Sequence, residues 1–294
     1  MISKELFSKI KHIDITTSRL VDSVFAGEYH SVFKGKGLEF DEVREYVPGD
    51  DIRDIDWNVT AKTGVPHTKR FVEARELTVV FMVDVSASEY FGSKARSKSE
   101  IIAEICALLA FSAIKNNDRV GVLFFSDRVE KFITPQKGKR HVLRVIREIL
   151  DFKPKGKKTD LNVALRALND IMTKKATVFL FSDFFDQGFE KLLKISHRKH
   201  DMVGVVVHDL RETDFPGLGF LEIEDIETGQ RVTMNSSNRG FRKRFSKISS
   251  ERRNELQRTF DSMRMDHIHI RSDEPYTEAL IQFFRQRAKR FKYA

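Results

Sequence analysis

An apolar run that ends in a short polar motif restricts the fold of this sequence more than any other feature. Residues 77–83 read Leu-Thr-Val-Val-Phe-Met-Val, and Asp84-Val85-Ser86-Ala87-Ser88 follows directly. A β-branched run of this length is typical of a buried parallel strand, whose two faces are both covered by helices. Ligands of open α/β sheets bind beyond the carboxyl ends of such strands. The run therefore predicts an α/β fold with polar groups at a ligand-binding edge.

Two more polar segments are expected at the same edge of the sheet. Thr159 lies in a Gly/Lys-rich loop before a helical pattern, and Ser182-Asp183 closes the apolar run 176–181. Hydroxyl and carboxylate oxygens are the ligands that Mg²⁺ and Mn²⁺ prefer, so neither His nor Cys is required. The sequence predicts one ion, Mg²⁺ or Mn²⁺, with five metal-site residues: Asp84, Ser86, Ser88, Thr159 and Asp183.

This donor set contains few carboxylates, and that composition indicates what the site does. An ion held mostly by neutral oxygens stays electron-poor, so it is expected to take a further Asp or Glu oxygen from a partner protein. The prediction is therefore a site that binds rather than cleaves. The alternative is that Ser86 and Ser88 cap the helix that follows and Asp183 caps another, as Ser and Asp often do.

The five positions resemble the metal-ion-dependent adhesion site of von Willebrand factor A domains. The Asp-x-Ser-x-Ser motif, a Thr in the loop Gly156-Lys157-Lys158-Thr159-Asp160-Leu161, and an Asp after the next apolar strand occur in the same order. The resemblance implies a mostly parallel sheet flanked by helices. It also implies that the last helix, expected at 275–291, can shift when the metal site is occupied.

A second resemblance covers nearly the whole chain. It rests on three segments near the start, 37–46, 48–57 and 68–71, and on Asp273-Glu274-Pro275-Tyr276 near the other end. These segments are similar to the signature of the bacterial domain-of-unknown-function family 58. The resemblance implies a partner, a MoxR-type AAA+ ATPase, and a role in the assembly or maturation of other proteins.

Alternating strand and helix patterns set the predicted organisation. From residue 77 onward they favour parallel β-α units, with one antiparallel edge strand and a hairpin inserted at about 213–238. Residues 1–76 differ in composition and are expected to form an accessory segment, with one helix and then short strands and loops laid against the main domain. The predicted domains are thus 1–76 and 77–294.

The periodicity also predicts individual elements. Strands are expected at 77–83, 119–125, 127–133, 176–181, 202–207 and 267–270. Helices are expected at 97–115, 139–151, 160–174, 187–199, 240–264 and 275–291.

Basic charge is concentrated in two regions and supports a rival function. Residues 137–158 hold nine Lys or Arg against two acidic residues, and residues 239–294 hold fifteen against seven. Such regions can neutralise phosphates, so a nucleic-acid-associated protein is the alternative. Solvated helix surfaces would give the same composition, and an acidic protein partner would also fit it.

Other candidate sites argue against an enzyme. Asp50, Asp51, Asp54 and Asp56 could hold two metal ions for hydrolysis, but nearby Arg44, Arg53 and Arg70 and the Pro48-Gly49 turn favour an ion-pair and turn network. Ser86 and Ser88 lack an identifiable base, and Gly156 to Thr159 lacks the upstream Gly of a nucleotide-binding loop.

Cysteine content and hydropathy bear on location. Cys106 is the single cysteine, so an internal disulfide is excluded and a reducing compartment is expected. The longest uncharged apolar stretch, 105–114, is too short to span a bilayer. Residues 1–17 mix charged and apolar side chains unlike a signal peptide. We expect a cytoplasmic protein without a membrane span.

Overall fold

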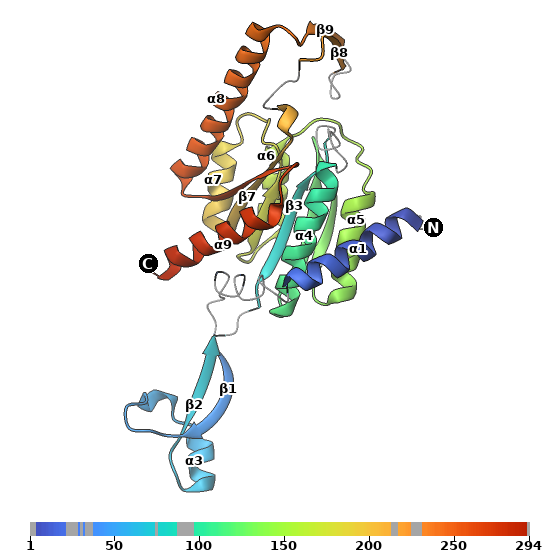
Figure 1. The fold of residues 1–294 in the computed structure, drawn as a ribbon. Helices are drawn as coiled ribbons and strands as arrows, with labels where there is room; N and C mark the ends of the chain where they lie inside the picture. Colours follow the sequence, from blue (N-terminus) through green and yellow to red (C-terminus); the bar gives the residue numbers. More distant parts are fainter. Residues whose placement is uncertain are drawn as a thin grey trace.

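A six-stranded sheet forms the centre of the protein (Figure 1). The structure is a computed structural model that describes residues 4–21, 29, 32, 38–73, 76–86, 97–212, 217–224 and 231–292. The strands lie in the order β10-β7-β6-β3-β4-β5. All neighbours are parallel except β5, which pairs antiparallel with β4. This confirms the predicted parallel sheet with one antiparallel edge. The bounds are β3 (Thr78–Asp84), β4 (Arg119–Phe125), β5 (Val129–Gln136), β6 (Thr177–Phe181), β7 (Asp201–His208) and β10 (Asp266–Arg271).

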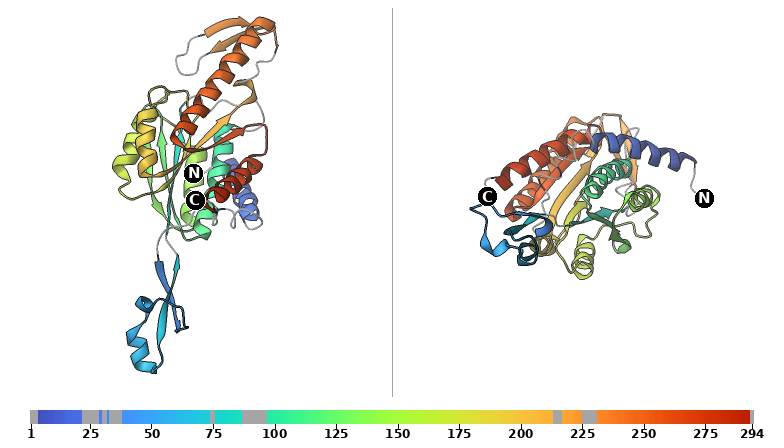
Figure 2. Two further views of the ribbon diagram at one scale, coloured as in Figure 1. Left: turned by 90° about the vertical axis from the view of Figure 1, so that its left-hand side faces the viewer. Right: turned by 90° about the horizontal axis from the view of Figure 1, so that it is seen from below.

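Helices cover both faces of this sheet (Figures 1 and 2). Neighbouring residues of a strand point to opposite faces, so Phe81 belongs to one buried apolar cluster and Met82 to the other. The first face carries α1 (Lys4–Leu20), α4 (Lys98–Lys115), α5 (Lys139–Asp151) and α9 (Tyr276–Lys292). The second carries α6 (Leu161–Ile171), α7 (Glu190–Lys199) and α8 (Arg239–Met263).

The predicted elements are found, with small differences at their ends. The strand expected at 119–125 and the helix expected at 139–151 match β4 and α5 residue for residue. The helix expected at 160–174 stops earlier, because Met172 takes an extended backbone conformation and closes α6 at Ile171.

An arm formed by residues 38–73 extends away from the sheet (Figures 1 and 2). It comprises β1 (Leu38–Glu45), the 3₁₀ turn η2 (Ile52–Asp54), α3 (Trp57–Thr63) and β2 (His67–Glu73), with β1 and β2 paired antiparallel. The expectation that these strands lie against the main domain is wrong. Of the described residues that precede the arm, α1 packs there with Ile13, and Tyr29 and Val32 are buried in the same core.

The inserted hairpin and α8 form a second projection. β8 (Phe220–Glu224) pairs with β9 (Arg231–Asn235), which confirms the predicted hairpin, while residues 225–230 between them lie outside the described residues. The first turns of α8 reach beyond the sheet, and Phe260 near its end is buried against β7 at Gly204 (Figure 1). A short 3₁₀ turn, η4 (Leu210–Glu212), follows β7.

Candidate metal-binding site

The predicted polar residues gather where β3 and β6 end. These strands are parallel neighbours, with Val83 paired to Phe181, so the residues that follow them meet at one edge. Asp84 is 1% exposed, Ser86 is fully buried and Asp183 is 7% exposed. The prediction that these strand ends converge is therefore confirmed by the sheet order.

Asp84 is the centre of this cluster. Its Oδ1 accepts a hydrogen bond of 2.9 Å from the backbone N–H of Ser86. Its Oδ2 accepts from the Thr159 hydroxyl at 3.3 Å and from the Ser182 hydroxyl at 2.9 Å. One carboxylate thus joins three chain segments that are far apart in sequence.

Ser182 is a residue that the sequence analysis did not select. It was recognised as part of the polar end of the strand, but only the adjacent Asp183 was assigned a role. Besides binding Asp84, its Oγ accepts a hydrogen bond of 3.1 Å from the backbone N–H of Phe184. Its position directly after β6 is the sequence feature that could have identified it. Of the predicted set, Ser88 lies outside the described residues.

The loop that carries Thr159 is held by the β4–β5 turn. Glu130 Oε1 accepts hydrogen bonds from the backbone N–H of Gly156 at 2.7 Å and from the Ser126 hydroxyl at 2.8 Å. A Cβ on Gly156 would collide with the side chains of Ser126 and Asp127. The close approach therefore requires glycine and fixes the loop against the sheet edge.

The residues on the other side of Thr159 are fixed as well. Asp160 donates its N–H to the Ser126 carbonyl at 3.0 Å, and its carboxylate caps α6 through Asn162 and Val163. Leu161 donates its N–H to Asp186 Oδ2 at 2.8 Å, which links this loop to the segment after β6. Thr159 is thus placed by backbone contacts on both sides.

Electrostatics at the cluster favour a cation. Burial, followed by the negative charge of Asp183, raises the pKa of Asp84 to about 6, while hydrogen bonds from Ser86 and Ser182 act in the opposite direction. Two carboxylates at one buried edge repel each other unless positive charge lies nearby. Burial lowers the pKa of Arg252 on α8, and the negative charge of Asp183 acts in the opposite direction. The Arg252 guanidinium is therefore close enough to interact with the Asp183 carboxylate.

The donor chemistry fits a hard ion such as Mg²⁺. Among the described residues, no group of three or more His, Cys, Asp or Glu side chains is arranged to hold a metal. A site here therefore depends on hydroxyl oxygens from Ser86 and Thr159 beside the carboxylates of Asp84 and Asp183, as the sequence analysis proposed.

Asp183 also belongs to a pocket beside the cluster. The pocket has a volume of about 280 Å³ and lies between α8 and the end of the sheet. Apolar side chains provide much of its lining, and Arg252, Arg253, His208 and Glu212 also line it. The apolar lining includes Phe185, Phe245, Ile248 and Leu256.

A buried lysine forms an ion pair with Glu212, one of the residues that line this pocket. Lys98, at the start of α4, has a side chain that is 1% exposed and forms an ion pair of 2.5 Å with Glu212. Burial raises the pKa of Glu212, Lys98 lowers it, and the Asp183 charge raises it. The charge of Glu212 in η4 is thus coupled to that of Asp183.

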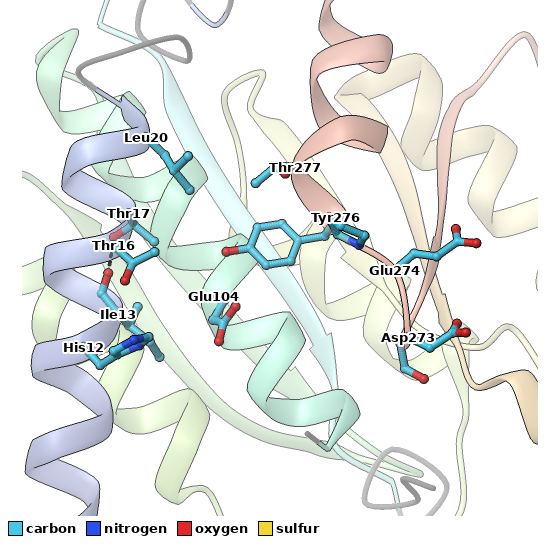
Figure 3. Close-up of a pocket in the computed structure, with 12 residues that line it drawn as sticks. His12, Ile13, Thr16, Thr17, Leu20, Glu104, Asp273, Glu274, Tyr276 and Thr277 are labelled. Carbon is cyan, nitrogen blue, oxygen red and sulfur yellow. Dashed lines mark hydrogen bonds between the residues drawn. The ribbon is translucent and has the colours of Figure 1, made fainter. Parts of the chain in front are cut away.

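A separate pocket contains the C-terminal signature residues Asp273 to Tyr276 (Figure 3). The Tyr276 ring points from the start of α9 toward α1. Arg271 pairs with Asp273 at 2.9 Å and with Glu274 at 2.7 Å. These acidic side chains therefore have a structural partner, and the signature serves to join the end of β10 to α9.

The acidic cluster of the arm forms the predicted ion-pair and turn network. Arg44 pairs with Asp50 at 2.6 Å, which holds the pKa of this carboxyl low. Asp56 caps α3 by accepting from the N–H groups of Asn58 and Val59. Lys69 lies 3.6 Å from Asp56 and is a cationic neighbour that was not expected, while the Arg70 side chain lies outside the described part.

The sheet topology and the cluster at the end of β3 define a von Willebrand factor A-like α/β domain. The chain belongs to the family described as "Protein of unknown function DUF58", whose model matches residues 42–255. It is similar to uncharacterized proteins of Mycobacterium tuberculosis and Mycobacterium bovis, with 26% identity over 97% of this chain and 90% of theirs.

Solved structures with a similar arrangement include two proteins of low sequence identity. BatB from Bacteroides thetaiotaomicron is 15% identical, with a TM-score of 0.44 over 72% of this chain and 99% of that chain. The SpRpn10 VWA domain is 11% identical, with a TM-score of 0.39 over 72% of this chain and 94% of that chain. None of the described helices is both long and apolar enough to cross a bilayer.

Proposed function

We propose that this protein is a non-enzymatic interaction module whose binding depends on a divalent cation, Mg²⁺ or Mn²⁺. One observation carries the proposal: Asp84 Oδ2 receives the hydroxyls of Thr159 and Ser182 at a buried edge that Asp183 also occupies. Oxygen donors converge there, and the charge of a cation would compensate that of both carboxylates.

Asp84, Ser86, Thr159 and Asp183 would hold the ion, together with Ser88 as the motif suggests. When bound, the ion supplies a positive charge that attracts a carboxylate from another protein. The chain itself keeps its hydroxyls in place through the Glu130 and Ser182 contacts and keeps Asp84 away from bulk water. A partner Asp or Glu is therefore the chemical group that we expect the site to recognise.

The partner that we propose is a MoxR-type AAA+ ATPase. This part of the proposal rests first on the resemblance to family 58. It also rests on the conformational cycle of such an ATPase, which requires a contact that is released in each cycle. A single metal–carboxylate bond backed by a modest interface meets this requirement. The proposed role is that of an adaptor in protein assembly or maturation in the cytoplasm.

The nucleic-acid alternative uses the basic regions 137–158 and 239–294. Within these regions Phe283 and Phe284 are buried in the core, so they are not available for stacking on bases. Lys131 and Arg147 pair with Glu148, which neutralises part of the charge around α5. Steep weakening by salt would favour nucleic acid, whereas loss of binding with a chelator would favour the metal site.

Titration calorimetry with Mg²⁺ and Mn²⁺ tests the ion, and co-purification tests the partner. Wild-type protein should bind one ion and should retain the ATPase in Mg²⁺ but not in EDTA. Asp84→Ala should abolish both while the circular dichroism spectrum stays native. Undiminished metal affinity in folded Asp84→Ala would remove the site. Equal recovery of the ATPase in Mg²⁺, in EDTA and with the variant would remove the metal bridge.

A further inference from the structure

The tip of the arm exposes large apolar side chains. Trp57 and Ile52 are each 66% exposed, and Val47 is 54% exposed. The arm buries none of the three against the sheet domain, from which it projects (Figures 1 and 2). Three large exposed apolar side chains within residues 47–57 of a projecting element indicate an interaction surface.

The pocket beside Asp183 offers a matching surface. Phe185 and Ile248 at this pocket are 51% and 57% exposed, and the Arg252 guanidinium lies 3.8 Å from the centroid of the Phe185 ring. A volume of about 280 Å³ suits one or two inserted side chains better than a drug-sized ligand. Aromatic anchors that enter such pockets typically dominate protein–protein affinity.

The two surfaces carry opposite charge. The arm, residues 38–73, contains nine acidic residues and five basic ones, whereas α8 contains eight basic residues and three acidic ones. Asp54 lies beside Ile52 in η2, is exposed, and forms no ion pair with any residue in the part of the chain that the structure describes. Arg252 and Arg253 lie at the pocket on α8.

Topology keeps these surfaces apart within one molecule. The arm precedes the first residue of β3 and so leaves from the amino-terminal edge of the parallel strands, whereas Asp183 and His208 lie at the carboxyl ends of β6 and β7. Figure 1 shows the arm and the start of α8 at opposite ends of the molecule. The arm therefore cannot reach the pocket of its own molecule.

We propose that the arm of one copy docks at the α8 pocket of a second copy of this chain. Trp57 and Ile52 occupy the pocket between Phe185 and Ile248, and Asp54 faces Arg252 and Arg253. Because the two surfaces differ, the contact is heterologous, and a pair of copies leaves one arm and one pocket unused. Repetition of this contact produces head-to-tail chains that grow with protein concentration. This contact does not require the proposed metal ion, although Asp183 belongs both to the pocket and to the candidate metal site.

Sedimentation velocity of the full chain in EDTA tests the proposal over a series of concentrations. Wild-type protein should form dimers and longer chains, and high salt should weaken them because charge pairs contribute. Trp57→Asp and Ile248→Asp should each raise the dissociation constant at least about tenfold. Ile195→Asp, an exposed apolar position on α7, serves as the control and should associate like wild type.

A mixture of the two variants provides the sharper experiment. Trp57→Asp retains an intact pocket and Ile248→Asp retains an intact arm, so the mixture should form heterodimers that cannot extend. Both positions are exposed, so both variants should fold, as circular dichroism can verify. A wild-type chain that stays monomeric throughout would overturn the proposal. So would a mixture that stays monomeric, or association of Trp57→Asp that equals wild type.

Discussion

The hydroxyl of Ser182 donates a hydrogen bond of 2.9 Å to Oδ2 of Asp84, and the two residues stand 98 positions apart in the chain. The same oxygen receives the Thr159 hydroxyl. The end of β6 is therefore tied directly to the motif that follows β3. This contact shows why the cluster depends on the order of strands in the sheet and not on any local sequence segment.

Asp84 should make the metal-free protein less stable as pH rises. Its pKa is about 6 in the fold against an ordinary value of 3.8, so the folded state binds this proton more tightly than the unfolded state does. The protonated Asp84 carboxyl adds roughly 3 kcal/mol to the free energy of unfolding below pH of about 4, and this contribution is lost as pH rises through about 6. Urea unfolding in EDTA at several pH values measures the change.

The comparison with Asp84→Asn isolates this carboxyl. Asp118 also has a pKa of about 6, raised mainly by burial, and it contributes a loss of the same sign in both proteins. The variant should therefore lose less stability over this pH interval than wild type does. Identical pH profiles for the two proteins would contradict the prediction, and Mg²⁺ should reduce the loss in wild type alone.

Thr159→Val should weaken Mg²⁺ binding about tenfold or more, which corresponds to about 1.4 kcal/mol. Valine keeps the shape of threonine but removes the hydroxyl that reaches Asp84. Thr159→Ser keeps the hydroxyl and is the matched control, which should bind nearly as wild type does. Calorimetry measures both. Equal affinity of the valine variant and wild type would assign Thr159 a purely structural role.

Much of this architecture could be predicted because periodicity reports burial. The run 77–83 became β3, and the antiparallel edge strand was identified at β5. Asp84 and Asp183, two of the predicted metal ligands, could be placed at one edge because parallel strands end together. Ser182 was missed because sequence does not reveal which of two adjacent polar residues turns toward Asp84.

The arm was misplaced for a different physical reason. Its β-prone segments predicted strands correctly, but a two-stranded hairpin can pair with itself and still extend away from a core. The exposed Trp57 contradicts the general tendency of large apolar residues to be buried. Periodicity indicates which residues form an apolar face. It does not show whether the surface that packs against this face belongs to the same molecule.

Gly156→Ala should impair metal binding without touching any predicted ligand. The added Cβ would collide with Ser126 and Asp127, so the loop that carries Thr159 must move away from the β4–β5 turn. We expect a loss of about 1–3 kcal/mol in unfolding free energy, as for other overpacked sites, and weaker Mg²⁺ affinity. Thermal unfolding and calorimetry provide the two measurements.

Gly217→Ala is the control for this change. A Cβ on Gly217 would make only ordinary contacts with Arg242 and Ser236, at 3.4 Å and beyond, so both measurements should stay near wild type. If Gly156→Ala bound Mg²⁺ as wild type does, the β4–β5 turn would not position Thr159.

Arg287→Met should destabilise the fold but leave Mg²⁺ affinity unchanged. The Arg287 side chain is 3% exposed and pairs with Asp201 at the start of β7 and with Asp266 at the start of β10. Removing one member of a buried ion-pair group leaves uncompensated charge and costs about 3–5 kcal/mol. Because both carboxylates lie at the amino-terminal edge of the sheet, the metal cluster at the other edge should not respond. Urea unfolding measures the loss of stability, and calorimetry measures the Mg²⁺ affinity. If Mg²⁺ affinity fell together with stability, α9 would be coupled to the metal site, as the resemblance to von Willebrand factor A domains implies.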